Sequence, residues 1–264
     1  MAPANNPWGD IFLSHMLKAS APTFTLASLH RCGSNELLPR ARTVVYRGMW
    51  TRLPDNPKNP APRNPRTYTS FMPTFTTDFR MEKVPDLMPS SHSHAQQQSK
   101  SSGGGGPVEA VFWIPEACTQ WRVRGRAFVL GPDIESDAAA PVRDALMPSM
   151  HPLDSEAGHE ANWSWSRELT AHFGNLSPLM RGSFRGPPPG TPVTGPPDNG
   201  HGLGQRVTDV HDARARANFG VVVIVPDEVD RVDLSNPDES RRWNYKLDTG
   251  GQHPAPWKET VLWP

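Results

Sequence analysis

The sequence predicts a mainly β domain with peripheral helices. The run NFGVVVIV, Asn218 to Val225, is typical of a strand buried on both faces. Six or seven strand-like segments follow one another without the regular helix alternation of a doubly wound sheet. Turn signals separate several of these segments at short spacing. Together these observations favour an antiparallel barrel or sandwich.

The N-terminal third predicts a helix followed by two strands. Residues 8–18 place apolar side chains near one helical face, which indicates an amphipathic helix covering a barrel end. Thr23 to His30 alternates as a first strand, and residues 32–36 form a turn. The second strand carries Arg42 and is expected to continue through Trp50.

The next stretch predicts one strand between two irregular tracts. Residues 53–66 are too rich in Pro and Asn for regular structure. A strand is expected over Tyr68 to Thr77, with a short helix opening near Lys83 to Pro85. Residues 89–106 are a low-complexity Ser/Gln/Gly tract and are expected to form a flexible loop.

The C-terminal half predicts helices and then further strands. Helical patterns cover 138–147 and 160–173, and the second contains an aromatic stripe that is typical of a core face. That stripe consists of Trp163, Trp165, Leu169 and Phe173. After Val225, PDEVDRVDL predicts a turn and a strand, and SRRWNYKL and WKETVLWP predict two more. We expect a single domain over 1–264, with flexible insertions at about 54–66, 89–107 and 185–217.

The composition excludes several classes of function. Lys and Arg number 27 and Asp and Glu number 27, so no global field favours nucleic acid or an anionic membrane. Cys32 and Cys118 show neither a disulfide framework nor zinc spacing, and no metal is expected. The opening residues lack a signal-peptide pattern, and no apolar run approaches roughly 18 residues. We therefore expect a soluble, cytoplasmic protein.

Two stretches place cations where a phosphate could bind. In RTVVYRG, Arg42 to Gly48, arginines flank a strand-forming core, and their spacing directs them to opposite sides of a straight strand. In TFTTDFRMEKVPDL, Thr74 to Leu87, hydroxyl groups and Lys83 gather at the start of a short helix. Taken alone, two arginines that flank a strand are most often solvated strand ends, and the alternative for Lys83 is an exposed cation on a helix.

In order along the chain, these stretches resemble the pyridoxamine 5'-phosphate oxidase-like FMN-binding split barrels. The family patterns are R-x-V-x-x-K/R and, some thirty residues later, F-x-T-D-x-R-x-x-K. The segment Ala110 to Leu130 adds the family's strand, loop and Gln, with Pro115, Gln120 and Gly125 at the corresponding positions. The resemblance implies an FMN-binding split β-barrel, a homodimer and a flavin-dependent redox reaction.

The resemblance also implies roles for individual residues. Arg42 and Lys83 would hold the FMN phosphate, Thr77 would add a contact there, and Arg47 would lie near the isoalloxazine and the substrate. Gln120 would bond the flavin ring or ribityl chain, and Arg242, or its neighbour Arg241, would approach the flavin across a dimer interface. The remaining cofactor contacts implied by the resemblance are Thr43, Val44, Thr76 and Arg80.

Departures from the family pattern leave the reaction open. Met81 stands where relatives commonly have a small hydroxyl residue, and Leu234 stands where the vitamin oxidases have a Trp. Glu82 stands where those oxidases have a second phosphate-binding Arg, and Arg80 could take over the role of that Arg. The residues that grip pyridoxamine phosphate are not found, so the substrate and any catalytic residue are unknown. The alternative is a flavin or haem carrier without turnover on the same fold. A structural protein assembled through its Pro-rich tracts is a third hypothesis, which would leave the three ordered motifs unexplained.

Overall fold

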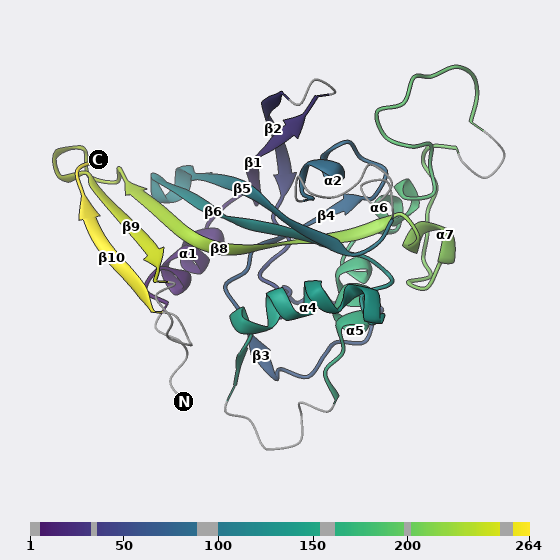
Figure 1. Cartoon of the computed structure of the whole chain (residues 1–264), viewed down its shortest axis with the longest axis horizontal. Helices are drawn as coiled ribbons and strands as arrows, with labels where there is room; N and C mark the ends of the chain where they lie inside the picture. The colour runs from purple at the N-terminus through teal and green to yellow at the C-terminus, as the bar shows by residue number, and fades with distance from the viewer. Residues whose placement is uncertain (1–5, 33–35, 89–99, 154–161, 198–201, 249–255) are drawn as a thin grey trace.

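The computed structural model describes residues 6–32, 36–88, 100–153, 162–197, 202–248 and 256–264. Its main sheet is antiparallel, in the order β10-β9-β8-β6-β5-β1-β2, with β4 paired to β8 (Figure 1). The strands are β1 (Thr23–Arg31), β2 (Leu37–Val45), β3 (Tyr68–Thr69), β4 (Thr74–Asp78), β5 (Gly103–Ile114), β6 (Thr119–Leu130), β7 (His151–Pro152), β8 (Phe219–Asp233), β9 (Arg241–Leu247) and β10 (Trp257–Leu262). The expected mainly β fold of the split-barrel type is confirmed.

The helices lie around this sheet. They are α1 (Gly9–Met16), α2 (Lys83–Asp86), α4 (Ala140–Leu146), α5 (Trp165–Gly174), α6 (Pro178–Ser183) and α7 (Ala213–Arg216). Short 3-10 turns cover Pro115–Ala117, Asp137–Ala139, Met147–Ser149 and Pro237–Glu239. No described helix is long and apolar enough to cross a membrane.

Strand β8 is the strand around which the sheet is arranged. It pairs with β6 along most of its length, with β4 near its start and with β9 near its end. Val222 and Ile224 face one apolar core, whereas Val221 and Val223 face another. Because both faces of β8 are covered, its sequence is continuously apolar where an exposed strand would alternate.

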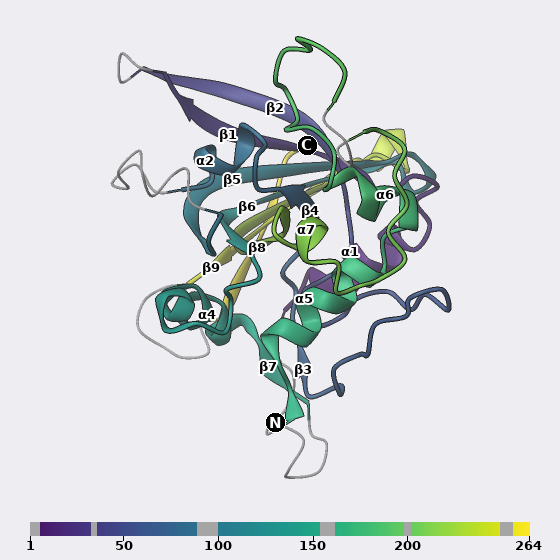
Figure 2. The ribbon, with the colours of Figure 1, turned by 90° about the vertical axis from the view of Figure 1, so that its right-hand side faces the viewer.

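The first of these cores fills the half-barrel and the second fills the space under the helices. The barrel core includes Phe12 of α1, Phe112 of β5 and Trp121 of β6. The second core joins the opposite face of β8 to α4, α5 and α7, and Figure 2 shows α4 and α5 together on one side of the long strands. The aromatic stripe of α5 lies in or against this second core, as the sequence indicates.

The segment after β2 connects β2 to β4 at one end of the half-barrel. The backbone N–H of Arg47 donates to the carbonyl of Thr74 over 2.8 Å, and the Thr74 N–H donates to Gly48 over 2.9 Å. These bonds link the end of β2 to the start of β4, although the sheet as a whole does not close. Arg47 is therefore fixed beside the mouth of the half-barrel.

Some predicted boundaries differ from the structure. Strand β2 ends at Val45 and does not reach Trp50, because Gly48 takes a φ of 99° that breaks the extended backbone. Arg47 thus lies past the strand, and the expectation that it faces opposite Arg42 on one straight strand is wrong. The strand expected over Tyr68 to Thr77 is two strands, β3 and β4, separated by a segment that ends at Pro73.

Two of the expected insertions also contain ordered structure. Gly103 to Gly106 form the first residues of β5, so the low-complexity tract ends earlier than expected, and its residues 89–99 lie outside the described part. Within 185–217, α7 is helical and Val207 and Val210 are buried in the second core.

The turn expected after Val225 is instead a register shift within β8, next to Gly125 of β6.

Candidate functional site

Arg42 lies in a polar cluster between β1, β2 and α2. Its Nη1 donates to Ser28 Oγ over 2.6 Å, and its Nη2 donates to Asp86 Oδ2 over 3.1 Å. The second oxygen of Asp86 lies 2.7 Å from Nδ1 of His30. The Asp86 side chain is only 3% exposed. This buried carboxylate fixes the direction of the guanidinium at the end of the half-barrel.

Lys83 is a neighbouring cation that no described carboxylate pairs with. Its Nζ contacts the sulfur of Met81 over 2.8 Å, and the Thr77 hydroxyl lies 3.8 Å from the same sulfur. Burial, and then the positive charge of Arg42, lower the pKa of Lys83, while Asp78 acts in the opposite direction. A half-buried cation next to a second cation is electrostatically suited to an added anion.

The other predicted phosphate contacts are arranged differently. Arg80 is held by Asp78 through Nε–Oδ1 and Nη2–Oδ2 contacts of 2.9 and 2.6 Å, and it also donates to the carbonyl of Gly186. Its guanidinium therefore ties β4 to the segment after α6. Thr76 alternates with Thr77 on β4 and points to the other face, Thr43 is exposed on β2, and Val44 is buried in the barrel core.

Gln120 and Arg242 lie together, but away from Arg42. They occupy one lateral row of the sheet, Gln120 on β6 and Arg242 on β9, with Val232 of β8 between them. The row of Arg42 instead passes through Leu26 of β1, Ala110 of β5 and Val123 of β6. On β6, Val123 is three positions after Gln120. Because side chains alternate along a strand, Gln120 points to the opposite face from that row.

Arg242 is itself held within the chain. Its Nε donates to Asp230 Oδ2 over 3.0 Å, whereas Arg241 is exposed and lies 3.6 Å from Glu239. Arg242 is therefore the better ordered of the two candidate arginines. One chain alone does not bring it to the Arg42–Lys83 pair.

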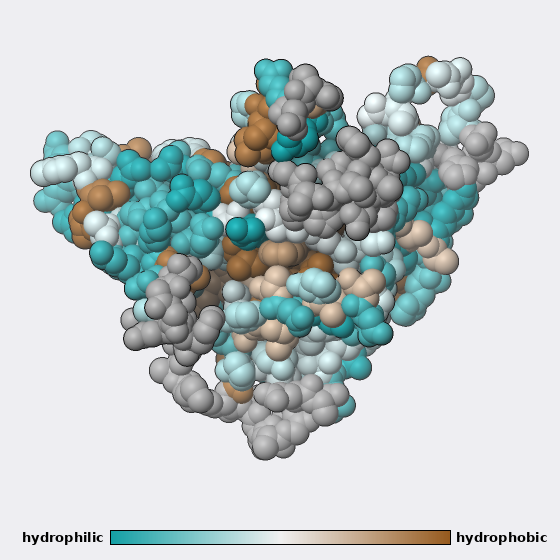
Figure 3. Space-filling model, in the orientation of Figure 1, coloured by the Kyte–Doolittle hydropathy of each residue, from teal (hydrophilic) through white to brown (hydrophobic). Residues whose placement is uncertain are grey.

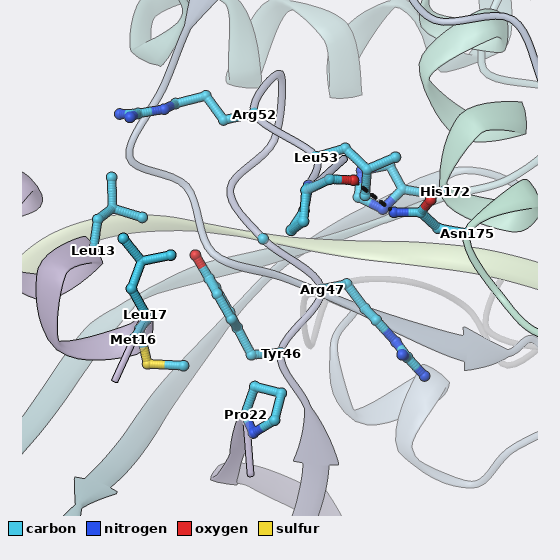
Figure 4. A pocket seen from close by; sticks show the side chains of 12 residues that line it. Leu13, Met16, Leu17, Pro22, Tyr46, Arg47, Arg52, Leu53, His172 and Asn175 are labelled. Atoms are coloured by element: carbon cyan, nitrogen blue, oxygen red, sulfur yellow. Dashed lines mark hydrogen bonds between the residues drawn. The ribbon is translucent and has the colours of Figure 1, made fainter. Parts of the chain in front are cut away.

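Arg47 lines a cavity of about 460 Å³ at the barrel mouth (Figure 4). Residues of α1, the 46–54 loop and α5 form its walls, and they include Tyr46, His172 and Asn175. Burial lowers the pKa of Arg47, and its Nε has no partner among the described residues. The sequence pattern did not identify His172, because a histidine within an amphipathic helix carries no signal that distinguishes it from a core residue.

The residues present fit a flavin mononucleotide at its phosphate end. A phosphate is a compact anion that takes several charge-assisted hydrogen bonds. Arg42 is oriented by Asp86 and Ser28, and Lys83 lies beside it without a described carboxylate partner. The cluster can therefore receive negative charge without first breaking an ion pair of Lys83.

Comparisons with known proteins concern the family and the fold. Residues 5–131 match the family model for the pyridoxamine 5'-phosphate oxidase, FMN-binding domain. The uncharacterized protein YGR017W of Saccharomyces cerevisiae is 22% identical over 313 residues, covering 98% of this chain and 98% of that protein. A pyridoxamine 5'-phosphate oxidase-related, FMN binding protein from Nostoc punctiforme shares the fold, with a TM-score of 0.57 and 18% identity over 99% of this chain and 100% of that one.

A more distant structure is PhzG from Burkholderia lata in complex with tetrahydrophenazine-1-carboxylic acid, with a TM-score of 0.43, 13% identity and coverage of 97% of this chain and 90% of that one. The family model covers strands β2 and β6, which carry Arg42 and Gln120, and helix α2, which carries Lys83, and the Nostoc fold extends across the C-terminal half. FMN is thus the cofactor of this domain. Residues 5–131 therefore form a divergent pyridoxamine 5'-phosphate oxidase-like FMN-binding domain, and the whole chain shares the fold of the Nostoc FMN binding protein.

Proposed function

We propose that this protein is an FMN-dependent oxidoreductase of the pyridoxamine 5'-phosphate oxidase-like type, in which Arg42 and Lys83 hold the FMN phosphate. The observation that supports the phosphate assignment is the half-buried Lys83, which has no carboxylate partner among the described residues, beside the ordered guanidinium of Arg42. An anion between these cations would relieve their mutual repulsion. Hydrogen bonds to charged groups contribute about 1.5–3 kcal/mol each, which is enough to make the phosphate a major determinant of affinity.

Neighbouring groups would have smaller roles in the same site. Among the described residues the Thr77 hydroxyl makes only long contacts, to the Asp78 carbonyl over 3.4 Å and to the Met81 sulfur over 3.8 Å, so it could turn its proton to a stronger acceptor. The Met81 sulfur lies where relatives commonly have a hydroxyl, and it is a weak acceptor that contributes little to an anion. Thr43, Val44 and Thr76 remain predicted contacts. Arg80 is assigned to the Asp78 pair and to the chain after α6.

A second copy of the chain would complete the site. Gln120 and Arg242 lie in the same row as Trp113 and Leu262, which are 51% and 39% exposed. Figure 3 also shows apolar surface on the projecting β1–β2 hairpin, where Leu29 and Leu37 are exposed. A symmetric dimer would cover such surface and would bring Arg242 of one chain, with Gln120 in the same row, to the flavin held by the Arg42–Lys83 pair of the other.

The redox capacity would come from the bound flavin, which accepts a hydride equivalent and passes electrons onward. The side chains would bind and orient, and none of them is assigned as a catalytic base. The alternative from sequence, a flavin or haem carrier, predicts cofactor binding without turnover. Oxygen consumption and flavin reduction by reduced nicotinamides or amines, measured on FMN-loaded protein, separate the two.

The phosphate assignment is tested by titrating FMN and riboflavin into Lys83→Met and Arg42→Gln proteins and following the quenching of flavin fluorescence. Loss of either cation should weaken FMN about 10- to 150-fold. Riboflavin, which lacks the phosphate, should bind all variants equally. The matched control is Arg124→Gln, because Arg124 is an exposed arginine of β6 whose ion-pair partner in the described part of the chain is Glu228. Unchanged FMN affinity in both variants would place the phosphate elsewhere.

A further inference from the structure

The cavity beside Arg47 has a buried floor and an open rim. Of its lining residues, Gly48 and His172 are buried, whereas Leu17 and Arg52 are exposed. Figure 4 shows Tyr46 in the centre of the view, with Leu13 and Met16 of α1 on one side and His172 of α5 and Asn175, which follows α5, on the other. The cavity is thus built by segments from both halves of the chain.

Several polar atoms around this cavity have no hydrogen-bond partner among the described residues. They are the Tyr46 hydroxyl, Arg47 Nε and both ring nitrogens of His172. His172 is 1% exposed, and its ring stacks on Trp50 with centroids 5.5 Å apart and planes at 14°. Buried polar groups are normally satisfied, so three unsatisfied side chains around one cavity indicate a ligand that supplies their partners.

The charges define the polar part of that ligand. Arg47 contacts the sulfur of Met180 at 3.8 Å, and no described carboxylate forms an ion pair with it. Burial, together with the charges of Arg63 and Arg47, lowers the pKa of His172 to about 3. The imidazole is therefore neutral at physiological pH and keeps one donor and one acceptor nitrogen. A single anionic group would be matched by the Arg47 charge and a His172 or Tyr46 donor.

The remaining walls define the apolar part. They consist of Leu13, Met16, Leu17, Pro22, Leu53 and Pro54. The Asn175 amide donates to the carbonyl of Pro54 over 3.1 Å, and its oxygen accepts from Asn59 over 2.8 Å, so α5 holds the proline wall in place. A small inorganic anion would leave these apolar surfaces uncovered, which favours a ligand with an apolar body.

We propose that this cavity binds an organic carboxylate with an apolar body, the carboxylate on Arg47 and His172 and the body against α1 and the 53–54 wall. Helix α5 lies outside residues 5–131 that match the family model, so His172 is a contribution of the C-terminal half to a pocket lined mainly by the matched region. The further claim that this carboxylate is the substrate of the flavin reaction rests on the proposed function. The binding itself does not.

The proposal is tested by isothermal titration of 2-naphthoate into FMN-loaded protein, with neutral 2-naphthamide as the matched ligand. The carboxylate should bind at least about tenfold more tightly than the amide, and Arg47→Gln should weaken 2-naphthoate about 10- to 150-fold while hardly changing 2-naphthamide. His172→Phe keeps an aromatic ring on Trp50 and should weaken 2-naphthoate roughly 2- to 12-fold. Arg124→Gln should bind both ligands as the unmodified protein does.

The outcomes separate this proposal from the proposed function. Absence of 2-naphthoate binding, equal affinity for the amide, or an Arg47→Gln protein that retains its folded spectrum and binds 2-naphthoate normally would overturn the pocket. If Arg47→Gln does not fold, an unchanged affinity in His172→Phe overturns it instead. If the protein does not take up FMN, the proposed function fails, and the same titrations of the FMN-free protein still test the pocket.

Discussion

The guanidinium of Arg42 lies against the carboxylate of Asp86, with Nη2 and Oδ2 3.1 Å apart, and the second oxygen of Asp86 lies against His30. An arginine proposed to bind phosphate is thus already paired within its own chain. The pair aligns Arg42, but its negative charge also opposes an incoming phosphate. This balance leads to the first prediction.

Asp86→Asn should destabilise the FMN-free protein more than the FMN-loaded protein. Removing one partner of a buried ion pair typically costs about 3–5 kcal/mol, and the partial exposure of Arg42 reduces this to a few kcal/mol. A bound phosphate would compensate the stranded guanidinium and make the loss smaller. Thermal unfolding with and without saturating FMN measures the difference. Asp233→Asn, which breaks the 2.8 Å pair with Arg231, should show no such FMN dependence.

The protein should be a homodimer whose sites combine both chains. Lys83→Met and Arg242→Gln proteins should each bind FMN weakly, because they lack a cation from opposite sides of the shared site. After unfolding and refolding an equal mixture, half of the dimers are mixed and each has one intact site, so about a quarter of all sites should regain tight binding. No recovery, or a monomer in light scattering with FMN bound, would show that the site lies within one chain.

His172 should make the protein sensitive to acid. Its pKa is lowered from 6.5 to about 3 in the folded state, mainly by burial. The unfolded chain therefore binds the extra proton first, and stability is lost as the pH falls from about 6.5 towards 3. Each unit corresponds to about 1.4 kcal/mol, so this group removes roughly 3 kcal/mol by pH 4. Denaturant unfolding of His172→Phe should show a decline smaller by that amount, and a parallel decline in both proteins would contradict it.

Gly48→Ala should distort the cavity mouth. Gly48 has a φ of 99°, and a Cβ there would lie 2.5 Å from Cδ of Pro54. The backbone strain costs on the order of 1–3 kcal/mol, and relief of the clash would move the Pro54 wall. Gly190→Ala is the control, since its φ is 81° but a Cβ would meet nothing within 4 Å. The free energy of unfolding should fall more for Gly48→Ala than for Gly190→Ala. The affinity for 2-naphthoate should fall for Gly48→Ala and stay unchanged for Gly190→Ala.

The sequence by itself determined the strands, the helices that cover them and the family motifs. NFGVVVIV is apolar without interruption because both of its faces are buried, and α1 and α2 carry helical patterns that depend only on near neighbours. Arg42 and Lys83 could be proposed as phosphate ligands for the same reason, since each lies in a pattern that is local to one strand or one helix. Boundaries at Gly48 and Pro73 were missed because backbone contacts with distant segments fix them.

Only the tertiary structure decided which of these residues meet. Asp86 and Ser28, 58 positions apart in sequence, both bond Arg42, and Arg80, which the motif suggested for phosphate, instead pairs with Asp78. His172 reaches the cavity of Arg47 from more than a hundred residues away, through the packing of α5 on Trp50. Such contacts depend on how sheets and helices pack rather than on local pattern. The sequence therefore specified the cofactor motif, and the fold specified the charges and walls around it.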